Sequence, residues 1–555
     1  MLLGEDNLRN GLTILIDTIK KDENAVIIID CDCDGYTSAA LLINYLYKIF
    51  PSWVLQNVDW IMHDSKQHGL SDCYETIIEG NLLTHKQYSL VICPDSSSND
   101  YKYHCELYNK GIKTLVLDHH LAPKISDYAV IINNQLSDYP NKELSGVGVT
   151  WQFCRYIDSM LNTNYANDFL DLVALGNCGD MMSLRSFETR YLITKGFKKD
   201  NIKNPFIDYM LDKNSFPLSK ADYVSSDPDM SCTSIGAAFF IVPFVNAITR
   251  SGTQEEKLLL FNAMLNHKAF EEILSNKRGH KLGEKEKLIL QAIRTVTNVK
   301  NRQTRAEDAG LAMLEKIIET NHMLDHKILL FLLEPGQIDS EIRGLIANKF
   351  MAKYQRPCCL LTRTNRNNKE TYEGSMRGYT KTGIDSFKEI LEQCPGITYV
   401  EGHDNAAGVG IEANHINDFL YCVDQLLKDV SVEPIYRIDY NFNEMDNNNQ
   451  RILEIAKMND YWGQDIDRAY ININFKITSS NFQVMKSNTL KFNLPNGLSI
   501  IKFNGTEEEI NKFTTTGYLE LNAICKCNAN EWNGNVYPQL LMEDYEIVDS
   551  SKYFF

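Results

Sequence analysis

The chain has 555 residues, 44% of them hydrophobic, which is too long for one ordinary core and predicts three or four globular domains. Its net charge of −17 excludes a general nucleic-acid coat, because binding to the phosphate backbone depends on Lys and Arg, but a nucleic-acid enzyme with bound metals and a local basic groove stays open. The 14 cysteines are scattered through the chain, which is typical of reduced thiols. We find no secretory signal and no apolar stretch near the ~20 residues that span a bilayer. We therefore expect a cytoplasmic protein with no membrane partner.

The first 200 residues alternate between strand and helix patterns. Continuous apolar runs predict buried strands at 25–30, 88–95, 113–120 and 129–134. A helix is predicted after the first strand at 37–49, and a helix-like stretch at 168–180 ends with Asp180. Apolar runs separated by helices are typical of a parallel sheet with both faces covered, so we expect an α/β fold.

The middle of the chain predicts a connector and a second α/β domain. Residues 253–299 carry charged helical patterns and few strand signals. Strand patterns return at 326–335 and 356–364, and a helix is predicted between them at 340–354. We interpret this part as a smaller α/β domain.

From about residue 431 the pattern changes to short strands separated by Asn, Gly and Pro turns. Five such strands, from "AYININFKI" to "YPQLLMEDYEIV", predict a small β-barrel. We therefore expect four parts: a parallel-sheet domain at 1–252, a helical connector at 253–322, a smaller α/β domain at 323–430 and a β-barrel domain at 431–555.

Acidic and imidazole side chains follow the predicted strands of the first domain. They are Asp30, Asp32 and Asp34 in "DCDCDG" after the first strand, Asp95 after the second, Asp118, His119 and His120 after the third, and Asp180 after the helical segment. Ligands of open α/β sheets bind at the carboxyl ends of the strands. Carboxylates crowded there repel one another unless cations are bound. Oxygen-rich ligands with one or two imidazoles suit Mn²⁺ or Mg²⁺, and a carboxylate that bridges two such ions is typical of phosphodiester hydrolysis.

Two other interpretations of these residues are weaker. Aspartates at strand ends are common turn formers, but four successive segments deliver such groups to one sheet edge. Cys31 and Cys33 offer a soft-metal site, but no second cysteine pair beside them has zinc-like spacing. On an extended strand end they alternate with the aspartates, so we expect them to face away as buried fillers.

The motifs resemble those of a known family. "DCDCDG", "DHH" at 118–120 and "ALGNCGD" at 174–180 resemble the DHH phosphoesterase superfamily, and within it the RecJ-like single-strand-specific exonucleases. "SGVGVTWQF", "VPFVNAITRSG", "GSMRG" and "GHDNAAGVG" follow in the order of that family. The resemblance covers nearly the whole chain. It implies a DHH domain, a DHH-associated domain and a C-terminal OB-type barrel.

The resemblance also implies roles for individual residues. Two divalent ions, Mn²⁺ or Mg²⁺, are expected to bind Asp30, Asp32, Asp34, Asp95, His119 and Asp180, with Asp95 as the bridge. His120 is expected to contact the scissile phosphate, and Asp118 to orient a ligand histidine. The 5′-terminal phosphates are expected to bind Arg250, Ser375, Arg377 and His403. Glu401 departs from the family's Gly-Gly-His motif and adds a negative charge near these residues.

We therefore expect a metal-dependent 5′→3′ exonuclease for single-stranded DNA in DNA repair, recombination or replication. The resemblance leaves a single-strand-binding protein or a helicase open as partners, and we expect a monomer. One alternative is a phosphodiesterase of short RNA or cyclic dinucleotides, which would not need the barrel and the connector. Another is a non-catalytic replication scaffold, which the complete set of ligand residues disfavours.

Overall fold

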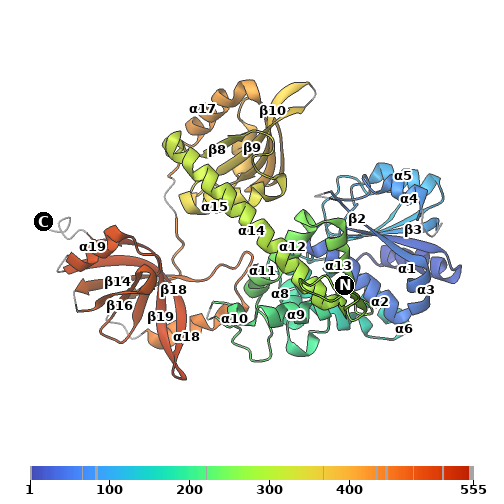
Figure 1. Cartoon of the computed structure of the whole chain (residues 1–555), viewed down its shortest axis with the longest axis horizontal. Helices are drawn as coiled ribbons and strands as arrows, with labels where there is room; N and C mark the ends of the chain where they lie inside the picture. The colour runs from blue at the N-terminus through green and yellow to red at the C-terminus, as the bar shows by residue number, and fades with distance from the viewer. Residues whose placement is uncertain are drawn as a thin grey trace. The chain divides into compact units, whose positions relative to one another are not determined.

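The computed structural model describes residues 3–548, apart from 65–66, 82–85, 221, 367, 432–434, 444–447, 479 and 516–517. Its contacts divide the chain into two compact units (Figure 1). One unit combines Met1–Val299 with Ile438–Phe555, and the other is Lys300–Arg437.

The N-terminal domain is built on a five-stranded parallel sheet in the order β2-β1-β3-β4-β5. The strands are β1 (Asn24–Ile29), β2 (Val58–Met62), β3 (Tyr88–Pro94), β4 (Lys113–Asp118) and β5 (Val130–Asn133). The predicted parallel sheet is thus confirmed. The edge strand β2 was not predicted, because Asp59 interrupts its short apolar run.

Helices cover both faces of this sheet, which explains why its strands are apolar on both sides. One face carries α1 (Glu5–Lys20), α2 (Cys33–Ile49) and α6 (Gly146–Leu161), and the other carries α4 (Tyr74–Glu79) and α5 (Tyr101–Asn109). In β1, Ile27 and Ile29 pack in the first core, whereas Val26 and Ile28 pack in the second. Each such side chain stabilises the fold by roughly 1.5–3 kcal/mol when fully buried.

Further helices complete this domain. They are α3 (Pro51–Asn57), α7 (Leu170–Gly179), α8 (Phe187–Gly196), α9 (Pro205–Lys213), α10 (Ser215–Leu218), α11 (Ser234–Phe240), α12 (Val242–Ser251) and α13 (Gln254–Met264). The stretch Ser234–Ser251 is apolar enough over 18 residues to cross a membrane by composition, which corrects the expectation that none approaches that length. It breaks at Ile241 into α11 and α12, and Ala237, Val245 and Ile248 pack in the domain core.

The predicted helical connector contains a hairpin. Between α13 and the long helix α14 (Leu288–Thr320), the chain forms β6 (Glu272–Leu274) and β7 (Lys285–Lys287). The structure thus adds two short strands to a region in which the sequence predicts mainly helix. Each has only three residues and is mostly exposed, so its charged sequence carries no apolar alternation.

The unit Lys300–Arg437 contains the second α/β sheet, in the order β11-β12-β10-β9-β8. Its elements are β8 (Leu329–Leu333), α15 (Ser340–Tyr354), β9 (Cys358–Arg366), β10 (Lys369–Arg377), α16 (Phe387–Glu392), β11 (Ile397–His403), β12 (Ala406–Glu412) and α17 (Ile416–Leu426). One face packs on α14 and α15, and the opposite face packs on α16 and α17. The predicted second, smaller α/β domain is confirmed.

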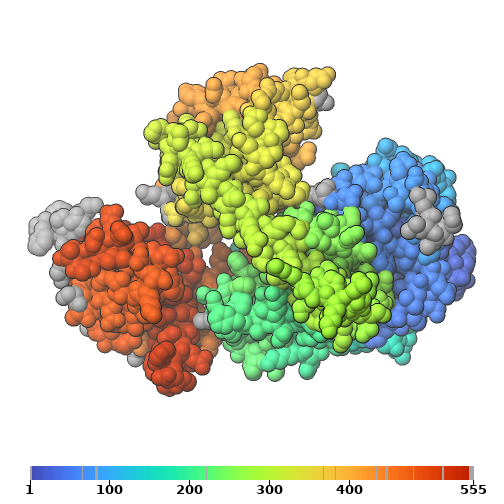
Figure 2. Space-filling view, viewed as in Figure 1, coloured from blue at the N-terminus to red at the C-terminus, as the bar shows by residue number. Residues whose placement is uncertain are grey.

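The C-terminal domain is a seven-stranded sheet in the order β13-β14-β18-β19-β17-β16-β15. The strands are β13 (Tyr440–Asn443), β14 (Tyr470–Thr478), β15 (Phe482–Met485), β16 (Thr489–Asn493), β17 (Ser499–Lys502), β18 (Tyr518–Trp532) and β19 (Asn535–Ile547). The five predicted strands are present. The space-filling view shows this part of the chain, coloured orange to red, as a closely packed body (Figure 2).

The sheet of the predicted β-barrel domain is not closed. In the described part of the chain no ladder joins the edge strands β13 and β15, so the sheet is open. Two helices supply the apolar cover that closure would otherwise give. Ile452 of α18 (Asn449–Ala456) is fully buried in the core, and Phe513 of α19 (Glu507–Thr515) packs against Phe482 and Phe492.

Candidate metal centre

Side chains that follow β1, β3 and β4 meet at the carboxyl edge of the parallel sheet. Ligand atoms of Asp30, Asp32 and Asp95 lie within 4.8 Å of one another. The same holds for the group of Asp34, His119 and Asp180, and for the group of Asp95, Asp118, His119 and His120. All residues that the sequence assigned to metal binding or catalysis are therefore brought together.

The "DCDCDG" segment is a helix start rather than an extended strand end. Helix α2 begins at Cys33, and Asp32 caps it by accepting hydrogen bonds from the backbone N–H groups of Asp34 (2.9 Å) and Gly35 (3.0 Å). The expected alternation of Cys31 and Cys33 along a strand is therefore wrong. Both cysteines are nevertheless buried, as expected of small fillers.

Asp34 is held by the N-terminus of α6. Its carboxylate accepts hydrogen bonds from Ser145 Oγ (2.9 Å) and from the backbone N–H groups of Gly146 (2.6 Å) and Val147 (3.2 Å). The helix N-terminus favours a negative charge here. Gly146 is needed for this packing, because a Cβ at this position would lie 2.4 Å from the Cβ of Asp95.

His119 lies between two carboxylates. Its Nε2 is 3.3 Å from Asp95 Oδ1 and 3.3 Å from Asp180 Oδ2. Three buried atoms of the cluster, His119 Nε2, Asp95 Oδ1 and Asp30 Oδ1, have no hydrogen-bond partner among the described residues. Buried polar atoms seldom stay unsatisfied, and divalent cations would satisfy all three.

The carboxylate of Asp118 accepts several hydrogen bonds and orients His120. Its carboxylate accepts from the backbone N–H groups of Ser98 (3.0 Å) and His119 (2.7 Å) and lies 2.7 Å from His120 Nδ1. Burial opposes ionisation, but the His120 hydrogen bond holds the pKa of Asp118 below its usual range. Partial burial likewise acts to lower the pKa of His120, but Asp118 raises it to about 9. Asp118 therefore favours the protonated form of His120, and it engages Nδ1 rather than Nε2.

The crowded carboxylates strongly favour bound cations. Burial raises the pKa of Asp30 to about 6. Burial, together with the neighbouring carboxylates, raises the pKa values of Asp95 and Asp180 well above their usual range. A set of carboxylates with one buried imidazole fits Mn²⁺ or Mg²⁺.

Two further histidines lie at this centre and were not predicted. His63 Nε2 is 3.9 Å from Asp30 Oδ1, and His68 Nδ1 is 2.7 Å from Asp30 Oδ2. His68 also contacts Cys31 Sγ at 3.7 Å. The signal that could have found His63 is its place directly after β2, a strand that the pattern missed.

A cavity of about 270 Å³ opens beside these ligands. It is lined by His68, His120 and the segment from Asp95 to Asp100. Within that segment Asp95 (φ 67°) and Ser97 (φ 79°) have left-handed backbone conformations that are uncommon for residues other than glycine. Such strain is concentrated at functional sites.

The predicted phosphate-binding residues are divided between the two units. Arg250 lies in α12 one turn beyond Asn246, whose side chain accepts a hydrogen bond from the backbone N–H of Cys33 at 3.1 Å, so Arg250 shares the helix face that meets the metal centre. In the other unit, Arg377 and His403 both pair with Ala406. Ser375 precedes Arg377 by two residues on β10, so these three predicted side chains lie on one face of the sheet. Their shared role remains a prediction.

Comparison with known proteins supports the assignment along most of the chain. The family described as DHH family, N-terminal domain, matches residues 24–177, and the DHHA1 domain matches residues 327–429. A putative SPbeta prophage-derived single-strand DNA-specific exonuclease of Bacillus subtilis is 32% identical over 549 residues, which cover 98% of this chain and 91% of that protein. The single-stranded-DNA-specific exonuclease RecJ of Haemophilus influenzae is 24% identical over 571 residues, with the same shares covered.

Solved structures share the fold. RecJ from Thermus thermophilus, solved in complex with Mn²⁺, matches with a TM-score of 0.71 at 16% identity, over 98% of this chain and 72% of that one. An exonuclease RecJ bound to manganese matches with a TM-score of 0.53 at 18% identity, over 76% of this chain and 94% of that one. The chain therefore belongs to the DHH family, and within it to the RecJ-like exonucleases.

Proposed function

We propose that the protein is a metal-dependent exonuclease that hydrolyses the phosphodiester bonds of single-stranded DNA from the 5′ end, in DNA repair, recombination or replication. The observation that carries this proposal is the buried group of unpartnered carboxylate and imidazole atoms at the sheet edge. The relatives named single-strand DNA-specific exonucleases support the substrate class.

The ligand residues divide into two adjoining groups that suit two ions. Asp30 and Asp32 belong to one group, His119 and Asp180 to the other, and Asp34 and Asp95 lie between carboxylates of both. These residues would hold divalent ions, which would supply an activated water and neutralise phosphate charge. Asp95, which adjoins both groups, would be the bridging ligand.

His120 contacts the phosphate in the proposed mechanism. Because Nδ1 of His120 is engaged by Asp118, its Nε2–H is the donor available to a phosphate oxygen. The side chain is 53% exposed, so an incoming strand reaches it. Asp118 itself is fully buried and acts by fixing the orientation and charge of His120.

The 5′ end would be recognised by Arg250, Ser375, Arg377 and His403. Arginine suits this task because its guanidinium pairs with phosphate through two hydrogen bonds. Glu401 shares the face of Ser375, because both residues pair with Gly408. Its negative charge would weaken the grip on the terminal phosphate.

The C-terminal domain would guide the strand toward the centre. Trp532 and Tyr537 stand on the β18–β19 hairpin with 67% and 48% of their surface exposed, so both rings are available to bases. Stacking of a base on an aromatic ring contributes ~1–3 kcal/mol. Phe503, which follows β17, is 58% exposed and is a further ring available to bases.

A cytoplasmic location, a monomeric state and association with a single-strand-binding protein or a helicase belong to the same proposal. The chain would then act on strands that such partners expose.

Digestion of end-labelled single- and double-stranded DNA tests the proposal. With Mn²⁺ or Mg²⁺ the single strand should be degraded and the duplex spared, and a chelator should stop the reaction. Preferential hydrolysis of short RNA or cyclic dinucleotides would instead favour the small-nucleotide phosphodiesterase. No hydrolysis of any of these substrates with either metal would favour the scaffold.

A further inference from the structure

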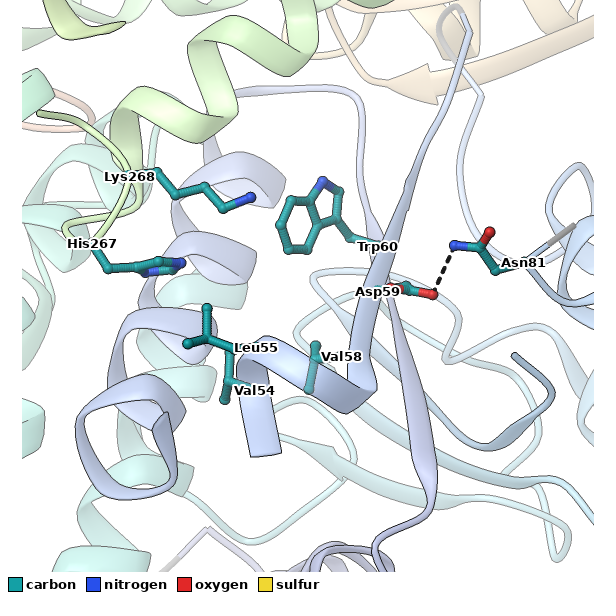
Figure 3. Close-up of a pocket in the computed structure, with 8 residues that line it drawn as sticks. All are labelled: Val54, Leu55, Val58, Asp59, Trp60, Asn81, His267 and Lys268. Carbon is teal, nitrogen blue, oxygen red and sulfur yellow. Dashed lines mark hydrogen bonds between the residues drawn. The ribbon is translucent and has the colours of Figure 1, made fainter. Parts of the chain in front are cut away.

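A second cavity lies at the edge of the parallel sheet and shares no residue with the metal centre. Its volume is about 280 Å³, and it is lined by Val54, Leu55, Val58, Asp59, Trp60, Asn81, His267 and Lys268. Figure 3 shows Lys268 and His267 on one side, Trp60 on the opposite side, and the aliphatic side chains below them. The cavity thus has an apolar floor and one flat aromatic wall.

The wall residues are held in place. Trp60 packs edge-on against Phe261 with ring centroids 5.7 Å apart. His267 stacks on Tyr47 at 4.1 Å, and its Nδ1 has no hydrogen-bond partner within the described chain. Burial and the nearby Lys268 lower the pKa of His267 to about 4, so its imidazole is neutral near pH 7.

Lys268 forms no ion pair with a carboxylate of the described residues. Its ammonium lies 4.6 Å over the ring of Trp60. Burial lowers the pKa of Lys268, and the charge of nearby Glu271 opposes this shift without forming an ion pair. Asp59 does not compensate this charge, because its carboxylate points to the other side of β2 and accepts from Asn81, Lys86 and Tyr88 (Figure 3). The cavity therefore combines a flat apolar slot with one ammonium group that no carboxylate of the described chain contacts directly.

We propose that this cavity binds a single nucleotide, with the base on Trp60 and the phosphate on Lys268. A volume of about 280 Å³ has room for one nucleotide unit and not for a chain of them. The base would take the place of the Lys268 ammonium on the indole ring, and the flexible lysine would turn to the phosphate. Stacking of a base contributes ~1–3 kcal/mol, and the ammonium gains a phosphate partner, which together offset the loss of the half-buried cation–π contact.

The site stands apart from the metal centre along β2. Trp60 precedes His63 by three residues, which is ~10 Å along a strand, and His63 approaches Asp30. The nucleotide has two sources, a unit of a bound single strand or a free mononucleotide such as the product of hydrolysis. The chemistry of the cavity is the same for both, and the proposal does not require that the metal centre cleaves DNA.

Binding to the full-length protein in a chelator tests the site, because no strand is cut under these conditions. The probes are an oligothymidylate and thymidine monophosphate, and the variants are Lys268→Gln and Leu55→Trp. Leu55 is 61% exposed, so a larger side chain fills the cavity without disturbing the core. We expect both variants to weaken binding about 5- to 10-fold, and Lys268→Gln to lower the salt slope of oligonucleotide binding by ~0.7.

Lys102→Gln is the matched control, because Lys102 also lies over an aromatic ring, that of Tyr103 at 5.2 Å, and is well exposed. It should leave binding unchanged. An effect on the oligonucleotide alone assigns the cavity to the strand, and an effect on the mononucleotide assigns it to free nucleotide. Binding that neither variant changes, or that the control weakens equally, would overturn the proposal. Loss of cleavage in Asp95→Asn with nucleotide binding intact concerns the metal centre only.

Discussion

Asp95 stands where the carboxylates of this protein are most crowded. It is 2% exposed, and one of its oxygens has no hydrogen-bond partner among the residues that the structure describes. Burial and four neighbouring aspartates raise its pKa well above the usual range. A buried carboxylate of this kind does not stabilise the metal-free protein. Its burial among other carboxylates is explained if Asp95 binds cations.

Asp95→Asn should therefore separate stability from activity. The amide removes the buried charge, so the midpoint of thermal unfolding in a chelator should rise. Hydrolysis should fall by more than the ~10–100-fold that loss of a supporting residue costs, because the proposed bridging ligand is lost. Thermal unfolding and single-strand digestion measure the two effects. Asp158→Asn is the control: this buried aspartate accepts from Tyr45, Thr163 and Ala166 outside the centre, so it should lower stability and spare hydrolysis.

The stabilisation by Mn²⁺ should grow with pH. The pKa of Asp30 is about 6 in the metal-free fold and 3.8 in the unfolded chain, so between these values the folded state binds more protons. The free energy of unfolding of the chelated protein therefore falls as pH rises through this window. A bound cation removes the penalty. The midpoint of thermal unfolding is measured with Mn²⁺ and with chelator at pH 4.5 and at pH 7. The difference between Mn²⁺ and chelator should be larger at pH 7, and an equal difference at the two pH values would contradict the account.

The site residues were predictable where they directly follow an apolar strand. Asp30, Asp95 and Asp118 are of this kind, because parallel strands deliver their carboxyl ends to one edge. His63 also directly follows a strand, β2, but Asp59 interrupts the apolar run of that strand, so the pattern does not predict it. His68 lies in a loop with no periodic pattern, and only the folded chain brings it to Asp30.

At the scale of secondary structure, the centre depends on how closely α6 approaches the end of β3. Gly146 opens α6, donates its N–H to Asp34 and leaves no room for a Cβ beside Asp95. The helix thus fixes two of the proposed ligands at once.

Gly146→Ala should disturb the positions of both Asp34 and Asp95. Overpacking at such a position typically costs ~1–3 kcal/mol, and the displaced helix start should weaken Mn²⁺ binding as well. Thermal unfolding and Mn²⁺ titration measure these effects. Gly148→Ala is the matched change in the same helix, where the added Cβ would meet only the Leu144 side chain at 3.1 Å. If both variants bound Mn²⁺ like the parent, the proposed coupling between α6 and the centre would be wrong.

The sequence predicts strands well where burial imposes a regular pattern of apolar residues. It does not predict which other elements pack on a sheet. The buried strands of the parallel sheet are continuous apolar runs and were found almost to the residue. The open C-terminal sheet has the alternation of a barrel, since a sheet covered by α18 and α19 buries the same face. The sequence pattern of a strand reports which face is covered and not whether a strand or a helix covers it.

At the scale of the whole molecule, the C-terminal sheet is joined to the first domain through a short segment. Asp460 accepts a hydrogen bond from Ser226 Oγ (2.8 Å), the backbone carbonyl of Gln464 accepts from the N–H of Leu184 (3.1 Å), and Arg468 pairs with Asp222. Truncation after Arg468 would keep these contacts and remove the sheet from β14 onward.

This truncation should reduce hydrolysis of long single strands far more than that of a dinucleotide. Long strands gain from several stacked bases and phosphate contacts, which are lost together, and the salt dependence of binding should become shallower. Initial rates on both substrates and binding at several salt concentrations measure the effect. An equal loss on both substrates would mean that the domain acts on the fold of the centre rather than on the strand.

The direction of degradation tests the central claim most directly. Single strands labelled at either end are digested with Mn²⁺ by the parent protein and by Arg377→Ala, with a chelator as the blank. We predict that the 5′ label is released first as a mononucleotide, only with the metal, and that Arg377→Ala slows this release while Mn²⁺ binding is kept. Earlier release of the 3′ label, or equal release in the chelator, would contradict a metal-dependent exonuclease that starts at the 5′ end.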